Sequence, residues 1–311
     1  MAGNNYYGNI WADGYLNSLP ADTITINLHN KRITHISAYI LLRFHNLTTF
    51  ICSKNKLTVL PFLPDSVRYI HCQNNDLIIL PLSLPPNLLH FNCSANRLKH
   101  LPAILPATLR WLICSGNELL ELPEELSAEL TGLICSHNQL SKLPGSLSNA
   151  DTRVIEIDAR NNQLTVLPIM PHGLMYLYIS NNRLTNIGSL IHTACLRVDF
   201  RENNISACPP MPIGVELHFS GTPLETVFRK LYGKSPVYMT EGHADKNNVI
   251  YNLRWTYYIG KFKRKIKDWL WERVRLPKIK AMYSPAQLTC MLAGIPDDAT
   301  AEEAQAVIDR W

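Results

Sequence analysis

Apolar residues recur at a fixed spacing along most of this chain. The stretch from Leu88 to Pro102, LLHFNCSANRLKHLP, follows the pattern L-x-x-L-x-C-x-x-N-x-L-x-x-L-P. The same pattern returns at Leu109 and at Leu130, each time 21 residues after the last copy. A constant period of about 20 residues is typical of a solenoid, in which each unit packs only against its neighbours.

The repeats are numbered here from their first apolar residue, so that apolar residues fall at positions 1, 4, 6, 11 and 14 and an asparagine at position 9. A degenerate first repeat has Ile26 at position 4 and Lys31 at position 9, and a last copy has Thr222 at position 9. The regular repeats between them start at Leu47, Val67, Leu88, Leu109, Leu130, Val154, Leu174 and Cys195. We therefore predict ten units within residues 23–230.

Positions 1 to 6 predict a short strand of a parallel sheet, with the side chains at positions 4 and 6 directed inward. The asparagine at position 9 suits the turn that follows, because its amide both donates to and accepts from backbone groups. We expect these asparagines to form a structural ladder, which consists of Asn55, Asn75, Asn96, Asn117, Asn138, Asn162, Asn182 and Asn203.

The remainder of each repeat is too short for a long helix and contains a recurrent Leu-Pro pair, such as Leu101-Pro102. Proline favours an extended return path over a helical one. The predicted fold is therefore an α/β-type solenoid, with a parallel sheet on the concave side and a mostly extended, polyproline-like convex side.

These repeats resemble the leucine-rich repeat family, in particular the short L-P-x-x-L-P type of bacterial effector proteins. The resemblance implies a horseshoe and a protein-binding module. Some effectors of this type are ubiquitin ligases with an additional helical domain that carries a catalytic cysteine followed by a nearby aspartate. Here the residues after the repeats number only about 80, and their single cysteine, Cys290, has no acidic neighbour. We therefore expect no enzyme and disfavour the ligase alternative.

The two ends of the chain depart from the repeat. Residues 1–22 are predicted to form an N-terminal cap, in which Tyr6, Tyr7, Trp11 and Tyr15 cover the first open core. Residues 231–311 are predicted to be a linker followed by a helical, partly basic tail, with helices after Lys261, from Ser284-Pro285 and from Thr300.

The tail concentrates positive charge, because residues 254–280 contain ten lysines and arginines but only two acidic residues. We expect a protein contact there through Lys263, Lys267, Trp269, Trp271 and Arg275. Nucleic acid and an anionic membrane are alternatives that we do not favour. The rest of the chain is nearly neutral, which argues against a nucleic-acid-binding solenoid.

The tail also resembles the C-terminal tails of proteins from giant double-stranded DNA viruses. The residues concerned are Trp269, Trp271, Val274, Arg275, Pro277, Lys278, Ile279, Tyr283, Pro285, Leu288 and Trp311. This resemblance implies a protein of infected-cell cytoplasm or of the virion. A structural role as a minor capsid or virion-associated component, anchored through the tail, is therefore an alternative hypothesis.

Five cysteines occupy position 6 of successive repeats: Cys52, Cys72, Cys93, Cys114 and Cys135. We interpret them as small buried apolar residues rather than as a metal or redox site. The sequence shows no zinc or phosphate-binding motif, and we expect no metal and no cofactor. We find neither a signal peptide nor a membrane span and expect an intracellular, cytoplasmic protein with reduced thiols.

The concave face is the candidate binding surface, since positions 2, 3, 5, 7 and 8 are expected to project from it. Its aromatic and mixed-charge composition is typical of a protein-binding patch. The alternative is that these side chains only stabilise the sheet by cross-strand stacking. The candidate partner-binding residues are Tyr69, His71, His90, Trp111, Ile113, Asp158, Arg160, Tyr176, Tyr178, Arg197 and Asp199.

Overall fold

A computed structural model describes residues 3–207, 212 and 215–232. The chain divides into two units, the first comprising Met1–Thr226 with Ser235–Thr240 and the second Val227–Lys234 with Glu241–Trp311. Nearly all described residues lie in the first unit, and the description below concerns that unit.

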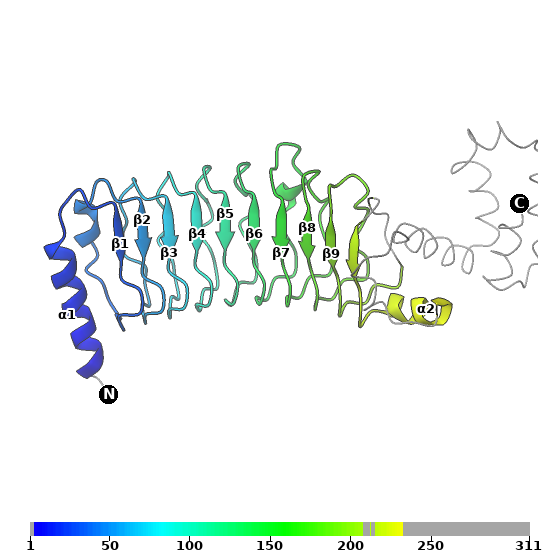
Figure 1. Ribbon diagram of the computed structural model, residues 1–311, viewed down its shortest axis with the longest axis horizontal. Helices are drawn as coiled ribbons and strands as arrows, with labels where there is room; N and C mark the ends of the chain where they lie inside the picture. The colour runs from blue at the N-terminus through cyan, green and yellow to red at the C-terminus, as the bar shows by residue number, and fades with distance from the viewer. Residues whose placement is uncertain (1–2, 208–211, 213–214, 233–311) are drawn as a thin grey trace, which may run out of the picture. The chain divides into compact units, whose positions relative to one another are not determined.

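The first unit contains a ten-stranded sheet whose strands follow one another in chain order (Figure 1). All neighbouring strands are parallel, and they pair in a constant register that aligns positions 3, 4 and 5 of one repeat with those of the next. This confirms the predicted solenoid. The strands are β1 (Thr25–Asn27), β2 (Thr49–Ile51), β3 (Tyr69–His71), β4 (His90–Asn92), β5 (Trp111–Ile113), β6 (Gly132–Ile134), β7 (Glu156–Asp158), β8 (Tyr176–Tyr178), β9 (Arg197–Asp199) and β10 (Glu216–His218).

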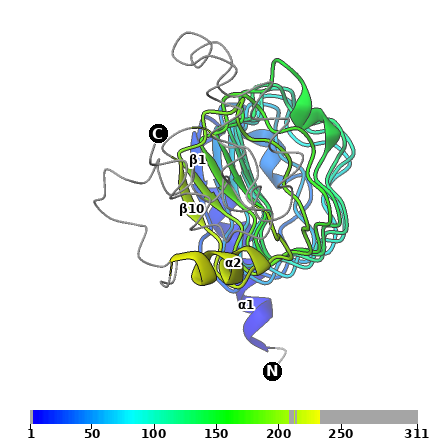
Figure 2. The same ribbon diagram turned by 90° about the vertical axis from the view of Figure 1, so that its right-hand side faces the viewer.

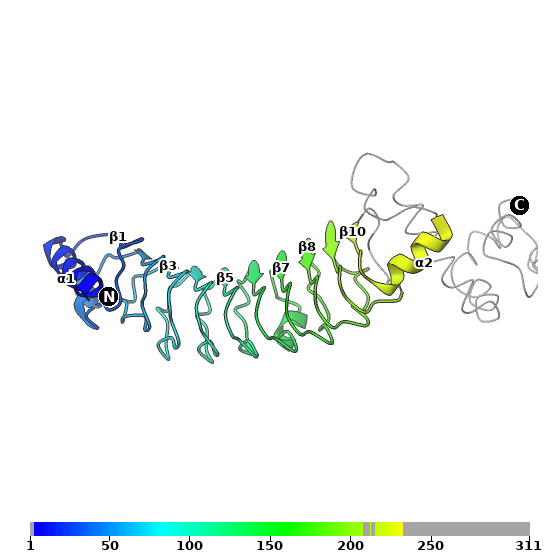
Figure 3. The same ribbon diagram turned by 90° about the horizontal axis from the view of Figure 1, so that it is seen from below.

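The core lies between the sheet and the return segments, which are the residues that connect successive strands (Figure 2). The middle residue of every strand, at position 4, is at most 9% exposed, and the residue at position 6 is equally buried. The strands lie on the inner side of a shallow arc, with the return segments outside (Figure 3). Side chains at positions 3 and 5 therefore project from the inner face.

The asparagine at position 9 joins each repeat to the preceding one. Asn96 is typical: its Nδ2 donates to the carbonyls of Cys72 and Cys93 at 3.1 and 2.9 Å, and its Oδ1 accepts from the Leu77 N–H at 3.0 Å. The series begins with Asn55 of the second repeat, whose Oδ1 accepts from the Ile33 N–H of the first repeat at 3.0 Å. Each amide thus satisfies three or more backbone groups that the sheet leaves open.

The residue at position 8 has a left-handed backbone in all ten repeats. Its φ lies between 51° and 71° at Asn30, Lys54, Asn74, Ala95, Gly116, His137, Asn161, Asn181, Glu202 and Gly221. Asparagine and glycine are frequent at this position because they tolerate positive φ best. This turn carries the chain away from the sheet after position 7. Three serines at position 7, Ser53, Ser136 and Ser180, are buried, whereas Arg160 and Arg201 at the same position extend over the inner face to Asp158 and Asp199. The expected projection of position 7 therefore holds in some repeats and not in others.

The return segments are mostly extended, as predicted from their prolines. Two short 3₁₀ helices interrupt them, η1 (Ile40–Arg43) and η2 (Gly145–Ser148). Neither these nor the two α-helices of the described residues is long and apolar enough to cross a membrane.

Helix α1 (Gly3–Ser18) lies at the N-terminal end of the solenoid (Figure 1). Its buried residues are Ala12 and Leu16, and Asn9 Oδ1 accepts from the Thr34 and His35 N–H groups at 2.9 and 3.0 Å. The expectation that Trp11 covers the core is wrong, because this side chain is 41% exposed and stacks on Tyr15 at 5.2 Å between ring centroids. The helix therefore buries Ala12 and Leu16, whereas the indole lies outside. The side chains of Tyr6 and Tyr7 lie outside the described part.

Helix α2 (Pro223–Tyr232) begins directly after the last repeat. Thr222, in place of the ladder asparagine, donates from Oγ1 to the Phe219 carbonyl at 2.6 Å and accepts from the Glu225 N–H at 3.3 Å. Threonine at this position therefore caps a helix instead of continuing the asparagine ladder.

Candidate protein-interaction surface

The predicted concave-face residues all project from the inner face of the sheet, where they form two chemically different patches. The aromatic patch, from repeats 3 to 6, consists of Tyr69, His71, His90, Trp111, Ile113 and Ile134. The charged patch, from repeats 7 to 10, consists of Glu156, Asp158, Arg160, Tyr176, Tyr178, Arg197, Asp199, Arg201, Glu216 and His218.

Trp111 dominates the aromatic patch. A Cβ added to Gly132, its neighbour on β6, would lie 2.3 Å from the indole ring, so the ring covers the space that a side chain would occupy there. The indole is nevertheless 36% exposed, and Tyr69 is 40% exposed. Glycine at position 3 of β6 therefore gives the tryptophan a flat seat on the sheet while one side of its ring faces solvent.

His71 and His90 lie diagonally across β3 and β4, with ring centroids 5.0 Å apart and ring planes 39° apart. Burial lowers the pKa of both imidazoles, and at His90 the neighbouring His71 lowers the pKa further. The Nδ1 atom of His90 is buried and has no hydrogen-bond partner among the described residues. The pair therefore favours the neutral state of both rings.

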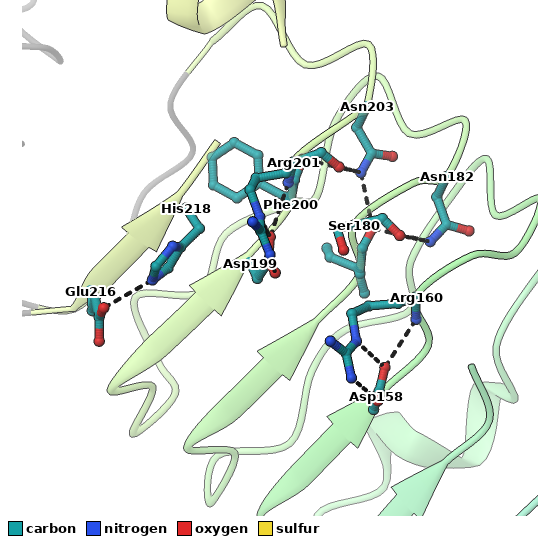
Figure 4. A network of polar contacts seen from close by, with 11 residues as sticks. Asp158, Arg160, Ser180, Asn182, Asp199, Phe200, Arg201, Asn203, Glu216 and His218 are labelled. Atoms are coloured by element: carbon teal, nitrogen blue, oxygen red, sulfur yellow. Dashed lines mark hydrogen bonds and ion pairs between the residues drawn. The ribbon is translucent and has the colours of Figure 1, made fainter. Parts of the chain in front are cut away.

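The carboxylates of Asp158 and Asp199 do not face a partner, which corrects their predicted role as exposed contacts. Their side chains are 8% and 4% exposed, respectively. Asp158 accepts from Nε and Nη2 of Arg160 at 2.9 and 2.7 Å, and Asp199 accepts from Arg201 at the same two distances (Figure 4). Each aspartate thus holds an arginine two residues later, and these hydrogen bonds raise the pKa of both guanidinium groups.

Tyr178 lies between two arginines at the centre of the charged patch. The guanidinium carbons of Arg160 and Arg197 lie 5.5 and 6.0 Å from its ring centroid. Burial raises the pKa of the Tyr178 hydroxyl, which therefore stays protonated. Such cation–π contacts order the side chains without neutralising the arginines.

Arg160 is held by an aspartate, whereas Arg197 is not. The Arg197 side chain makes neither a hydrogen bond nor an ion pair with a described residue, and its Nε is buried. The adjacent carboxylate of Glu216 is directed to His218, with 2.9 Å between Glu216 Oε1 and His218 Nε2 (Figure 4). The sequence carries a signal for this difference that the sequence analysis did not use, because the D-x-R spacing occurs at Arg160 and Arg201 but not at Arg197.

The position-6 cysteines form a buried column of free thiols beneath the sheet, all 0% exposed. Burial raises the pKa of each thiol, to about 12 at Cys114. Within the described residues, no group of three or more histidine, cysteine or acidic side chains is arranged to hold a metal ion.

Several predicted contacts cannot be placed on this surface. The tail contacts Lys263, Lys267, Trp269, Trp271 and Arg275 lie outside the described residues, as does Cys290. The predicted tail helices after Lys261 also lie outside them.

A second apolar surface, on the return segments, was missed by the sequence analysis. Tyr39 and Phe62 stack with centroids 5.7 Å apart and are 72% and 52% exposed, while Val59 and Ile79 form a bridge between two return segments. Leu82 is 96% exposed. The signal was present, because apolar residues occupy positions 13 and 16 of repeats 2 and 3, on either side of the Leu-Pro pair at positions 14 and 15.

Comparison with solved structures supports the fold. A leucine-rich effector protein, YopM, from Yersinia pestis is 25% identical, with a TM-score of 0.55, over 71% of this chain and 66% of that one. A leucine-rich repeat protein from Leptospira interrogans is 20% identical, with a TM-score of 0.54, over 63% and 60%. The leucine-rich repeat domain of LRIM1 is 17% identical, with a TM-score of 0.57, over 74% and 85%.

No protein-family model and no curated protein sequence matches the chain. The chain spans less than two thirds of the length of the two bacterial proteins. Its described part has the fold of leucine-rich repeat proteins. That fold is consistent with a protein-interaction module.

Proposed function

We propose that this chain is a non-enzymatic protein-interaction module that binds a protein partner through the inner face of repeats 3 to 9. The observation that carries the proposal is the exposure of Tyr69 and Trp111 on a continuous sheet surface that also presents Tyr176 and Tyr178. Tyrosine, tryptophan and arginine are the residues that contribute most to protein interfaces. Their seating on a rigid parallel sheet reduces the entropy lost on binding.

The two patches offer a partner different kinds of contact. Aromatic side chains at repeats 3 to 5 supply apolar area, and held arginines at repeats 7 and 9 supply fixed donors. An interface usually combines such an apolar centre with polar contacts around it.

A capture experiment with matched variants tests the proposal. The first variant carries Tyr69, Trp111, Tyr176 and Tyr178 all changed to alanine. The second carries the same change at Tyr39, Phe62, Ile79 and Leu82, which are exposed on the return segments. We expect partners captured by the wild-type chain to be lost by the first variant and kept by the second. Equal capture by the first variant would contradict the proposal.

The tail supports a second candidate function. Its basic stretch and its resemblance to tails of giant-virus proteins favour a virion-associated structural component, anchored through residues 254–280. In that case the protein would be recovered from purified particles in a fixed ratio to the capsid protein. A cytoplasmic interaction module would instead be found mainly in the soluble fraction of the infected cell.

A further inference from the structure

Arg197 is the cation of the inner strands with no acceptor among the described residues. A guanidinium presents five N–H donors, and leaving a buried donor without an acceptor is destabilising. The buried Nε of Arg197 is in this state. Arg160 and Arg201, by contrast, are held by buried aspartates.

The surroundings of Arg197 keep it oriented without satisfying it. Its register partners across the sheet are Tyr176 on one side and Glu216 on the other. The Tyr178 ring centroid lies 6.0 Å from the guanidinium carbon of Arg197, and the Glu216 carboxylate contacts His218 Nε2. An external acceptor would complete this arrangement.

We infer that Arg197 is the contact point for a carboxylate of the partner, supplied by an aspartate or glutamate in an extended segment that crosses the inner face. The inference rests on the proposed function and gives it a chemical specificity. Arginine binds carboxylates in a planar, two-pronged geometry. A singly charged group fits better than a phosphate, because the charged patch has four carboxylates and three guanidiniums, and a dianion would be repelled by Glu156 and Glu216.

The aromatic patch sets the second requirement for the bound segment. Ile134 on β6 and Arg197 on β9 are separated by three strand spacings, or about 14 Å at about 4.8 Å per strand. An extended peptide covers about 3.4 Å per residue, so an apolar residue seated at Trp111, Ile113 and Ile134 lies about four positions from the carboxylate. The partner segment therefore combines an apolar side chain with an acidic one at this spacing.

Selection from a phage-displayed library of random 12-residue peptides tests the inference. The full-length wild-type chain is the bait, and binders that also bind the variant with alanine at Tyr69, Trp111, Tyr176 and Tyr178 are removed. We expect the remaining peptides to share an acidic residue about four positions from an apolar one. Peptides that need the inner face but lack an acidic residue would overturn the inference and leave the proposed function standing. If the removal step left no peptides, because every binder also bound the alanine variant equally well, the proposed function itself would fail.

Two arginine variants then locate the carboxylate. Changing the acidic residue of a selected peptide to its amide should weaken binding to the wild type by at least about 10-fold, and to Arg197→Gln by less than about twofold. Arg183→Gln, at an exposed position outside the strands, should behave as the wild type. Equal losses on the wild type and on Arg197→Gln would place the carboxylate elsewhere and overturn the inference. So would tighter binding of a phosphoserine peptide than of the aspartate peptide.

The melting temperature distinguishes lost contact from lost folding. Arg197→Gln loses the Tyr178 contact but no acceptor among the described residues, so it should melt no more than about 3 °C below the wild type. A larger decrease would show that Arg197 has an internal acceptor, which would also overturn the inference.

Discussion

The aromatic and charged patches stand on the same sheet and in the same register, but they are stabilised in opposite ways. In the aromatic patch, the Trp111 ring packs over Gly132, so this exposed ring is positioned by van der Waals packing. In the charged patch, Arg160 and Arg201 are held by aspartates buried in the sheet surface. The comparison indicates that a repeat framework separates stability from surface chemistry, because core and ladder positions stay constant while positions 3, 5 and 7 vary.

The largest loss of stability is expected from the ladder asparagines, which are common to the repeats of both patches. Asn96→Ala and Asn203→Ala each leave buried backbone groups without a partner and should lower the free energy of unfolding by about 3 kcal/mol. Because the bonds are the same in both repeats, the two losses should be similar in urea unfolding. Asn87→Ala, which removes one exposed bond to the Asp65 carbonyl, is the control and should cost little. Very different losses at Asn96 and Asn203 would contradict a uniform framework.

The next effect concerns the charged patch alone. Asp199→Ala removes the carboxylate that accepts from Arg201 Nε, Nη2 and backbone N–H, and should lower the free energy of unfolding by about 2 kcal/mol. Asp76→Ala breaks the Asp76–Arg97 pair, which has the same 2.7 Å separation but side chains that are 36% and 64% exposed. That control should cost no more than about 0.5 kcal/mol. Equal costs in chemical denaturation would show that burial of Asp199 is unimportant.

The third effect concerns the aromatic patch. Gly132→Ala places a methyl group in the space that Trp111 occupies and should lower the free energy of unfolding by about 1 kcal/mol or more. In a chain that already carries Trp111→Ala, Gly132→Ala should lower the free energy of unfolding much less, since the clash is then absent. Gly173→Ala, whose new Cβ would lie 3.8 Å from its nearest atom, should be neutral. Additive losses in the double variant would mean that the indole does not cover Gly132.

The smallest effect is a pH dependence that belongs to the aromatic patch. The pKa values of His71 and His90 lie below the ordinary value of 6.5, so the unfolded chain takes up protons first as the pH falls. Their contribution to stability is therefore complete above pH 6.5 and decreases below it. Relative to His71→Asn/His90→Asn, the wild type should lose up to about 2 °C of melting temperature between pH 7 and pH 5. His100→Asn, an exposed histidine outside the patch, should follow the wild type.

Much of the fold could be predicted because the spacing of residues within one repeat determines the structure of that repeat. The spacing of apolar residues and of Asn96 or Asn117 specified the strands, their parallel order and the ladder positions. The left-handed turn at position 8 was harder to see, since Lys54, Ala95 and Glu202 occupy it beside the more telling Asn74 and Gly221. Periodicity reports which side of the chain is buried, but not which backbone conformation follows.

The site was predicted less completely, because position alone does not tell a presented side chain from a supporting one. Asp158 and Tyr178 occupy the same position of consecutive repeats, yet the aspartate is buried beneath Arg160 while the tyrosine stays half-buried on the surface. The difference arises from the residue two places later, which is arginine in one repeat and Ser180 in the next. Contacts between side chains of neighbouring repeats, such as Trp111 over Gly132, lie beyond what a single repeat encodes.

Site-specific photo-crosslinking locates a bound partner on the inner or the outer side of the solenoid. A benzophenone amino acid is placed at Asn92 or Tyr176 on the inner face, or at Phe62 or Ile104 on the return segments, and each chain is irradiated with its captured partner. If the partner binds the inner face, crosslinks form from the two inner-face positions and not from the two outer ones. Crosslinks from Phe62 and Ile104 alone would contradict inner-face binding, and would assign binding to the apolar surface of the return segments.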